Sequence, residues 1–437
     1  MLSAFGNVFK TPDLRKKVFF TLMILAIFRL GATIPTPNVN LVTIRECVNL
    51  SAAGDRAGLY SLINLFSGGA LLNLAVFALG IMPYITSSII LQVLATAVPR
   101  LEALKKEGSA GQAKITQYTR GLTIVLAVLQ ATSFTMMAVN DQLFPGCPGS
   151  VVYDDGLISI ITMILVMVAG TGVIMWLGEL ITERGIGNGM SILIFTQIAA
   201  RFPQSMWSIR TNHPGNRGLL LFFVVLGVGL LIMLAVLFVE QGQRRIRVQY
   251  PKKQVGNRTV GGTTSYIPIK VNQAGVIPVI FASSLMFLPS LYVMFFPEGN
   301  GADWIARNLS GQTPSWIYTG VMIALIIAFA FFYVSITFNP VEISDNMRKA
   351  GGFIPGIKAG TPTENYISYV LSRMTSVGSL YLSIIWVIPT LAVLYLAADA
   401  NFPFGGTSIL IIVGVGLDTV KQIESQLHQR HYEGFLK

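Results

Sequence analysis

Charged residues are scarce in this chain. Asp, Glu, Lys and Arg make up 12% of its 437 residues, whereas hydrophobic residues make up 53%. A soluble protein carries about 25% charged residues, because water must solvate its surface. The scarcity excludes an ordinary soluble enzyme or binding domain and indicates a membrane protein in which one helical bundle takes up nearly the whole chain.

Residue types that carry catalysis or hold metal ions are also few. The three histidines, His213, His428 and His431, fall outside the apolar segments. The sequence has neither the His-Glu-x-x-His pattern of zinc proteases nor the Gly-x-x-x-x-Gly-Lys pattern of phosphate-binding loops. An intramembrane enzyme would need a catalytic pair at membrane depth, and the sequence offers none. We therefore expect a protein that is not an enzyme and that binds no cofactor or metal.

Acidic residues are missing from the centres of the apolar segments. Glu179, Asp399 and Asp418 lie near segment ends, and Arg29 is the one clear charge inside a segment. Ion-coupled transporters usually place ionisable groups inside the helix bundle. The lack of such groups counts against a ten-span secondary transporter built from an inverted repeat, which remains the second hypothesis for this chain. A scaffold without a pore is a weaker third. For Arg29 we expect snorkelling or helix pairing.

Only two cysteines are present. Cys47 and Cys147 both fall in loops that we place outside the cell, where oxidation is possible. Two separate free thiols are the favoured expectation over a disulfide.

What the chain does contain is apolar windows of about 20 residues, the length that crosses a bilayer as a helix. These windows predict an all-α polytopic membrane protein with ten transmembrane helices. The expected spans are 18–34, 72–98, 117–139, 156–177, 189–205, 218–239, 272–296, 316–338, 367–396 and 405–420.

The positive charges indicate how the spans are oriented. With the N-terminus placed inside, about 24 of the 31 Lys and Arg residues fall on inner loops and tails. This bias places both termini in the cytoplasm. It also accounts for most of the net charge of +11, which therefore does not by itself indicate a nucleic-acid partner.

Two short repeats divide the chain into halves, 1–217 and 218–437. Gly80-Ile-Met-Pro-Tyr-Ile85 in the second span matches Gly275-Val-Ile-Pro-Val-Ile280 in the seventh, and Gly189-Met-Ser-Ile-Leu-Ile194 in the fifth matches Gly406-Thr-Ser-Ile-Leu-Ile411 in the tenth. Five spans per half is an odd number, so paired spans cross in opposite directions. This is the pattern of two inverted five-helix halves around a central pore.

The repeats also indicate an apolar constriction in that pore. An apolar ring excludes water and ions by dewetting, yet it opens for anything that pushes the side chains apart. Taken alone, each isoleucine would be ordinary packing, and the position in the repeat is what singles it out. The predicted lining is Ile81, Ile85, Ile194, Ile280 and Ile411.

Two inner loops are longer than topology requires. Residues 240–271 alternate apolar and polar residues on both sides of a Gly/Thr run, 260–264, and predict a β-hairpin with its tip there. Residues 339–365 form a second basic protrusion. Two basic loops on one face indicate a docking site for a large, partly anionic partner, although solvated loops without a partner are the alternative.

Five motifs, in order, resemble those of the SecY family, the channel subunits of the bacterial protein translocase. They are Gly80-Ile-Met-Pro-Tyr-Ile85, Ile181-Thr-Glu-Arg-Gly-Ile-Gly-Asn-Gly-Met-Ser191, Asn339-Pro-Val-Glu-Ile343, Gly351-Gly-Phe-Ile-Pro-Gly-Ile357 and Asp418-Thr-Val-Lys-Gln-Ile423. The resemblance covers essentially the full length. It implies a conduit in the plasma membrane that passes unfolded secretory chains across and releases membrane segments sideways into lipid.

The resemblance also implies roles for residues near the pore. The constriction ring would add Met190, where the family more usually has isoleucine, to Ile81, Ile85, Ile194, Ile280 and Ile411. Residues 57–70 would form a plug hinged at Gly68 and Gly69, where glycine permits movement. The second and seventh spans would form a lateral gate. Its polar residues would be Thr86, Ser87, Ser88 and Gln92 facing Asn272, Gln273, Ser283 and Ser284.

The resemblance finally implies partners. The basic inner loops would receive the ribosome, including its RNA, or the motor ATPase SecA, and the small subunits SecE and SecG would complete the complex. Signal sequences, nascent chains and lipid would contact the gate. The docking residues would be Arg244, Arg245, Arg247, Lys252, Lys253, Arg348, Lys349 and Lys358. At Lys358 relatives commonly carry Arg, so the bidentate fork of that contact is absent here.

Overall fold

A computed structural model gives the fold of the chain. It describes residues 11–51, 68–71, 73–140, 143, 149–212, 216–255, 258–262, 264–295, 299, 301–309, 315–396 and 406–433. Most of the predicted plug, including residues 57–67, lies outside these ranges.

Helices account for most of the described chain, and each of the ten expected spans coincides with one of them. These helices are α2 (Pro12–Gly31), α5 (Met82–Ala97), α7 (Ser109–Val139), α8 (Leu157–Arg184), α9 (Gly189–Asn212), α10 (Asn216–Gln241), α11 (Ile277–Phe295), α13 (Trp316–Thr337), α15 (Thr361–Leu396) and α16 (Gly406–Glu433). Shorter helices are α3 (Leu41–Ser51), α6 (Pro99–Lys106), α12 (Ala302–Asn308) and α14 (Pro340–Lys349).

Not every one of these helices is a long apolar rod. Within the described residues, five are long and apolar enough on their own to cross a membrane, and a sixth span is added if α5 and α6 are counted together. α5 and α6 meet at an angle of 103°. The break falls at Val98, which is extended and precedes Pro99, as expected from the restriction that proline places on the residue before it.

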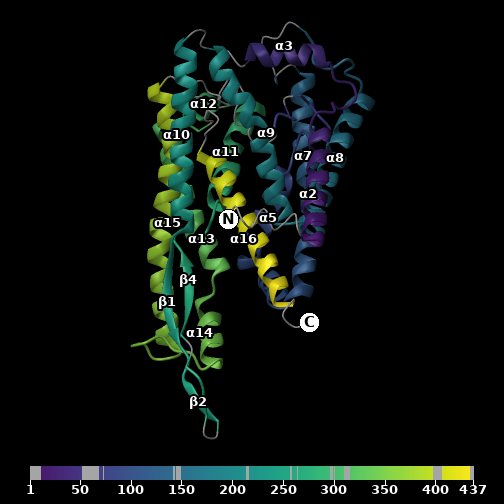
Figure 1. Ribbon diagram of the computed structural model, residues 1–437. Coiled ribbons are helices and arrows are strands. Elements are labelled where there is room, and N and C mark those ends of the chain that lie inside the picture. Colours follow the sequence, from purple (N-terminus) through teal and green to yellow (C-terminus); the bar gives the residue numbers. More distant parts are fainter. Residues whose placement is uncertain are drawn as a thin grey trace.

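The helices form two groups (Figure 1). One contains α2, α5, α7 and α8, and the other contains α10, α11, α13 and α15, with α9 and α16 between them. α9 packs against both α10 and α16, so the fifth, sixth and tenth expected spans join the groups. α5 also contacts α11 across the division. Each group therefore packs as a unit, and the two units meet along α9–α10–α16 and along α5–α11.

The second and seventh spans begin later than their apolar windows. Residues 73–81 form turns before α5 begins at Met82, and α11 begins at Ile277 rather than at residue 272. Gly80 and Gly275 have positive φ angles of 58° and 62°, a conformation that a right-handed helix cannot include. The expected starts were therefore wrong by several residues, because hydropathy does not register backbone conformation.

The two copies of the first sequence repeat also share the same backbone structure where their helices begin. In both copies the positive-φ glycine is followed by the same hydrogen bonds: Ile85 N–H donates to Ile81 O at 3.1 Å, and Ile280 N–H donates to Val276 O at 3.3 Å. The second repeat agrees, since Gly189 and Gly406 are the first residues of α9 and α16. The two halves thus share their local geometry at the positions that the repeats single out.

The hairpin predicted for residues 240–271 is present. β1 (Gln243–Gln249) and β4 (Thr264–Lys270) are antiparallel, with Gln243 opposite Lys270 and Gln249 opposite Thr264. β2 (Lys252–Val255) and β3 (Arg258–Gly261) extend it, with Val255 opposite Arg258. The expected tip at 260–264 was wrong, because Gly261 pairs with Lys252 and the chain reverses between Val255 and Arg258. The hairpin projects beyond the helices, at the end opposite α3 (Figure 1).

Candidate functional site

Four of the six residues of the predicted ring belong to one apolar cluster. Ile81 is buried, and Ile85, Met190 and Ile194 are half-buried; all four belong to a cluster formed by α2, α5, α8 and α9. In the other half, Ile411 on α16 is buried and Ile280 on α11 is half-buried. The structure therefore brings the four ring candidates of the first half together in one apolar cluster.

Glycines allow the two helices that carry Met190 and Gly178 to touch. A Cβ added at Gly189, the first residue of α9, would overlap the carbonyl oxygen of Gly178 on α8. Gly189 N–H also donates to the hydroxyl of Thr182 at 2.9 Å. This contact holds Met190 next to Gly178. The position of Met190 therefore depends on Gly178 and Gly189 having no side chains.

The predicted plug joint is bonded to the first span. Gly68 and Gly69 have positive φ angles of 61° and 90°, which glycine adopts without strain. Arg29, the one charge inside an expected span, donates from Nη1 to the carbonyl oxygen of Gly68 at 3.3 Å. Gly68 also lies against Gln197 of α9. Snorkelling or helix pairing was the role predicted for Arg29, and its bond to the joint is a contact that the sequence did not reveal.

The hydroxyls of the predicted gate mostly bond within their own helices. Ser87 donates to the carbonyl of Pro83 at 2.8 Å on α5, and Ser283 donates to that of Val279 at 2.8 Å on α11. Thr86 likewise bonds to Met82, and Gln92 bonds to Ser88. The Ser284 hydroxyl is buried without a hydrogen-bond partner. Thus, within the part of the chain that the structure describes, the α5–α11 contact has no hydrogen bond between these predicted gate residues.

Asn272 and Gln273 lie just before α11 and turn toward their own half. Asn272 Nδ2 donates to Glu240 Oε1 at 2.6 Å and to the carbonyl of Gly275 at 3.1 Å, and both Glu240 and Asn272 are buried. Gln273 accepts the N–H of Lys270 at 3.1 Å. These contacts fix the turn that leads from the hairpin into α11, so both residues position the start of α11.

The two basic loops form a single protrusion. Backbone hydrogen bonds join Gln249 of β1 to Phe353, at 2.9 Å in one direction and 3.0 Å in the other. Ile246, Val248 and Ile269 of the hairpin share an apolar cluster with α13, α14 and α15. Gly352 lets the loops approach, because a Cβ there would lie 2.9 Å from the ring of Tyr250.

Most of the predicted docking cations are exposed on this protrusion. Arg244, Arg245 and Arg247 lie on β1, with Arg245 opposite Pro268 and Arg247 opposite the exposed Tyr266. The remaining exposed cations are Arg348, Lys349 and Lys358. Arg348 also forms an ion pair of 3.3 Å with Asp345. Lys252 and Lys253 lie on β2.

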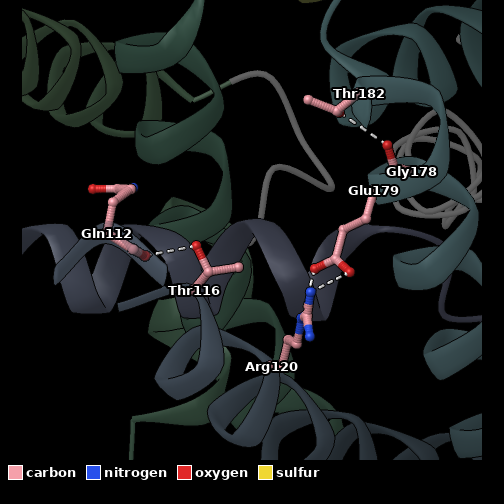
Figure 2. Close-up of polar contacts among 6 residues, drawn as sticks. All are labelled: Gln112, Thr116, Arg120, Gly178, Glu179 and Thr182. Atoms are coloured by element: carbon pink, nitrogen blue, oxygen red, sulfur yellow. Dashed lines mark hydrogen bonds and ion pairs between the residues drawn. The ribbon is translucent and has the colours of Figure 1, made fainter. Parts of the chain in front are cut away.

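An ion pair that the sequence analysis did not assign joins the third and fourth spans. Arg120 of α7 and Glu179 of α8 form two hydrogen bonds of 2.7 Å (Figure 2). The Arg120 side chain is 49% exposed and that of Glu179 is 19% exposed. Glu179 was noted as an acid near a segment end, and Arg120 falls at the edge of the expected span 117–139, but their partnership depends on helix packing that spacing does not show.

The cysteine expectation was wrong for Cys47, which is buried and disulfide-bonded. Its only possible partner within the chain is Cys147, which lies outside the described residues. Cys47 sits on α3 in a core shared with α7 and α8.

Solved structures define the class of protein that this fold represents. The chain resembles "The structure of a protein conducting channel", with a TM-score of 0.60 and 17% identity over 94% of this chain and 91% of that one. It also resembles Sec61 in the canine ribosome-channel complex from the endoplasmic reticulum, with a TM-score of 0.57 and 17% identity over 94% and 91% of the two chains. The fold is that of protein-conducting channels, with ten transmembrane helices in two halves.

Sequence comparison identifies the family. A family model for SecY matches residues 75–420. The protein translocase subunit SecY of Streptomyces scabiei is 58% identical over 100% of both chains, and that of Mycobacterium tuberculosis (strain ATCC 25618 / H37Rv) is 53% identical over 100% of both. The chain belongs to the SecY family, and it is a multi-pass membrane protein.

Proposed function

We propose that this chain is the pore subunit of a translocase that passes unfolded secretory proteins across the plasma membrane and releases membrane proteins sideways into lipid. The observation that carries the proposal is the meeting of α5 and α11, two helices with the same glycine-proline start, beside the apolar ring cluster. The chain itself carries out no reaction and binds no cofactor.

The halves, residues 1–217 and 218–437, form the two walls of the conduit. The ring of Ile81, Ile85, Met190, Ile194, Ile280 and Ile411 closes around a passing chain and excludes ions by its apolar surface. Residues 57–70 block the resting pore and swing at Gly68 and Gly69. A polypeptide can displace these groups because each contact is weak, whereas a hydrated ion gains nothing from entering an apolar ring.

The lateral gate lies between α5 and α11. Thr86, Ser87, Ser88 and Gln92 line one side, and Ser283 and Ser284 line the other, while Asn272 and Gln273 hold the start of α11. The absence of hydrogen bonds between these sets in the described residues supports an interface that parts readily, because parting leaves the intrahelical bonds intact.

The basic protrusion is the dock for a driving partner, with both termini on the same cytoplasmic side. Ribosome-bound Sec61 and Ssh1 channels share this fold, which supports a ribosome as one partner. We assign SecA as the second driver and SecE and SecG as the small subunits. Arg245 and Arg247 extend along the exposed face of β1, where guanidinium groups suit bidentate binding of phosphates or carboxylates.

Ion conductance tests the conduit. The complex of this chain with its small subunits is placed in planar bilayers, and wild type is compared with a deletion of residues 57–67 and with Ile85→Asn and Ile280→Asn. Ile85→Val serves as the matched control. We expect a silent wild type, a silent control and leaky variants. Silence of all the variants together with ion-coupled solute uptake in vesicles would replace the conduit with the transporter hypothesis.

A further inference from the structure

We propose that Lys105 latches the cytoplasmic side of the lateral gate by binding the C-terminal end of α13. The inference rests on the proposed gate between α5 and α11. Lys105 Nζ donates to the carbonyl oxygen of Ile336 at 3.4 Å. Lys105 lies near the end of α6, in the first half, and Ile336 is the last residue but one of α13, in the second half. The bond therefore crosses between the halves.

The carbonyl of Ile336 needs a donor from outside its helix. A helix leaves its last four carbonyls without intrahelical partners. The residue four positions after Ile336 is Pro340, which has no N–H, and Phe338 and Asn339 are extended. The last turn of α13 also contains no basic residue. Lys105 supplies both the donor and the positive charge that a helix C-terminus favours.

On the first-half side, Lys105 is coupled to the gate helix. Val98 ends α5 by donating its N–H to the carbonyl of Leu94 at 2.8 Å, and its own carbonyl accepts the N–H of Leu101 at 3.0 Å, so α5 and α6 are joined through this one residue at their bend. Gly111 of α7 packs on the backbone of Leu104, and a Cβ at Gly111 would overlap that carbonyl oxygen. Lys105 consequently moves with α5 and α7.

On the second-half side, Ile336 is coupled to α11. The ring of Phe281 on α11 meets those of Phe329 and Tyr333 on α13 edge to face, with centroids 5.7 and 6.5 Å apart. α13 therefore follows α11. When α5 and α11 separate, the ammonium group of Lys105 and the carbonyl of Ile336 must separate too, and the latch favours the closed gate.

The latch is weak enough to be reversible. Lys105 is exposed, and a cation at an exposed helix C-terminus shifts an equilibrium by about two- to fivefold. Such a contribution does not lock the channel. It sets how much signal peptide is needed to open the gate.

The experiment measures gate opening in the full complex in lipid vesicles. Fluorophores are attached to azide-bearing residues replacing Ile90 on α5 and Leu285 on α11, both exposed, which leaves the native cysteines intact. A synthetic signal peptide with a basic start and a leucine core of about 12 residues is titrated, and energy transfer reports the gate distance. For Lys105→Met we expect the half-maximal peptide concentration to fall about two- to fivefold.

Matched variants separate a latch from other effects. Lys105→Arg keeps the donor and should behave as wild type, whereas Lys105→Glu should open more easily than Lys105→Met because it places a negative charge at the helix C-terminus. Arg100→Met removes a neighbouring charge from α6 and should change nothing. If Lys105→Met opens at the wild-type concentration in a complex that translocates a secretory precursor, the latch is overturned and the proposed function stands. If the wild-type gate never opens at any peptide concentration, both the latch and the proposed function are overturned.

Discussion

The guanidinium of Arg29 binds the carbonyl oxygen of Gly68, so a charge on the first span holds the joint that precedes the second. Gly68 has a positive φ angle, and its backbone could otherwise rotate at little energetic expense. A charge within an apolar segment is destabilising unless it is paired or serves a function. We infer that Arg29 fixes the orientation of the proposed plug joint.

Arg29→Met should therefore loosen the joint and raise the resting ion conductance of the channel. A hydrogen bond to a charged group contributes about 1.5–3 kcal/mol, so the fraction of unplugged channels should rise about tenfold or more. Planar-bilayer recordings measure this directly. Arg29→Lys, which keeps one charged donor, should leak less than Arg29→Met; equal conductance of Arg29→Met and wild type would show that the bond does not hold the plug.

The Arg120–Glu179 ion pair should stabilise the packing of α7 on α8. The pair is bidentate but half-exposed on the Arg120 side, so we expect a coupling of about 1 kcal/mol. Thermal unfolding of Arg120→Met, Glu179→Gln and the double variant gives this coupling as a double-mutant cycle. The exchanged pair, Arg120→Glu with Glu179→Arg, should recover part of the stability that the single variants lose. Additive single effects would mean that the two residues act independently.

Gly189→Ala should destabilise the fold, because its Cβ would overlap the backbone of Gly178 and push α9 away from α8. Overpacking of this kind lowers the free energy of unfolding by about 1–3 kcal/mol. Gly227→Ala on α10 is the matched control, since nothing lies within 4 Å of its added Cβ. The unfolding temperature of Gly189→Ala should fall, whereas that of Gly227→Ala should not. Because Met190 follows Gly189, the first variant should also leak ions, and a stable, silent Gly189→Ala would contradict the close contact.

The disulfide of Cys47 should stabilise the packing of α3 against α7 and α8. If Cys147 is the partner, the bridge closes a loop of about 100 residues, which corresponds to roughly 4–5 kcal/mol in the chain-entropy account. Mass spectrometry of unreduced peptides should find the two cysteines linked, and reductant should lower the unfolding temperature. Cys47→Ser should unfold at the same lower temperature with or without reductant. Separate, unlinked peptides would rule the bridge out.

The spans, the hairpin and the repeats could be predicted because each has a strong local signal. Hydropathy located ten helices, and alternation located the paired strands β1 and β4. The exact helix starts could not be predicted, since they depend on positive φ angles at Gly80 and Gly275. The hairpin turn was misplaced for a similar reason: glycines near residue 261 suggested a tip, but strand register places the reversal between Val255 and Arg258.

The contacts between distant residues were beyond sequence reasoning. Lys105 and Ile336 are 231 positions apart, and Arg120 and Glu179 are 59 apart. Nothing in the spacing of such residues shows that packing will bring them together. The gate hydroxyls show the converse. The family resemblance implied that they face one another between helices, but a serine in a helix can satisfy its hydroxyl at the carbonyl four residues earlier, as Ser87 and Ser283 do.

The apolar cluster beneath the basic protrusion has a mechanical consequence. The hairpin residues Ile246 and Val248 pack with Ala330 and Val334 of α13, whose last turn holds Ile336. A load applied to the proposed dock would therefore reach α13, in the second half, directly through these side chains, whereas the first half would receive it through the contacts of α9 with α10 and α16 and of α5 with α11. A driver bound at the protrusion would thus load the two halves unequally, and the contacts between the halves would carry the difference.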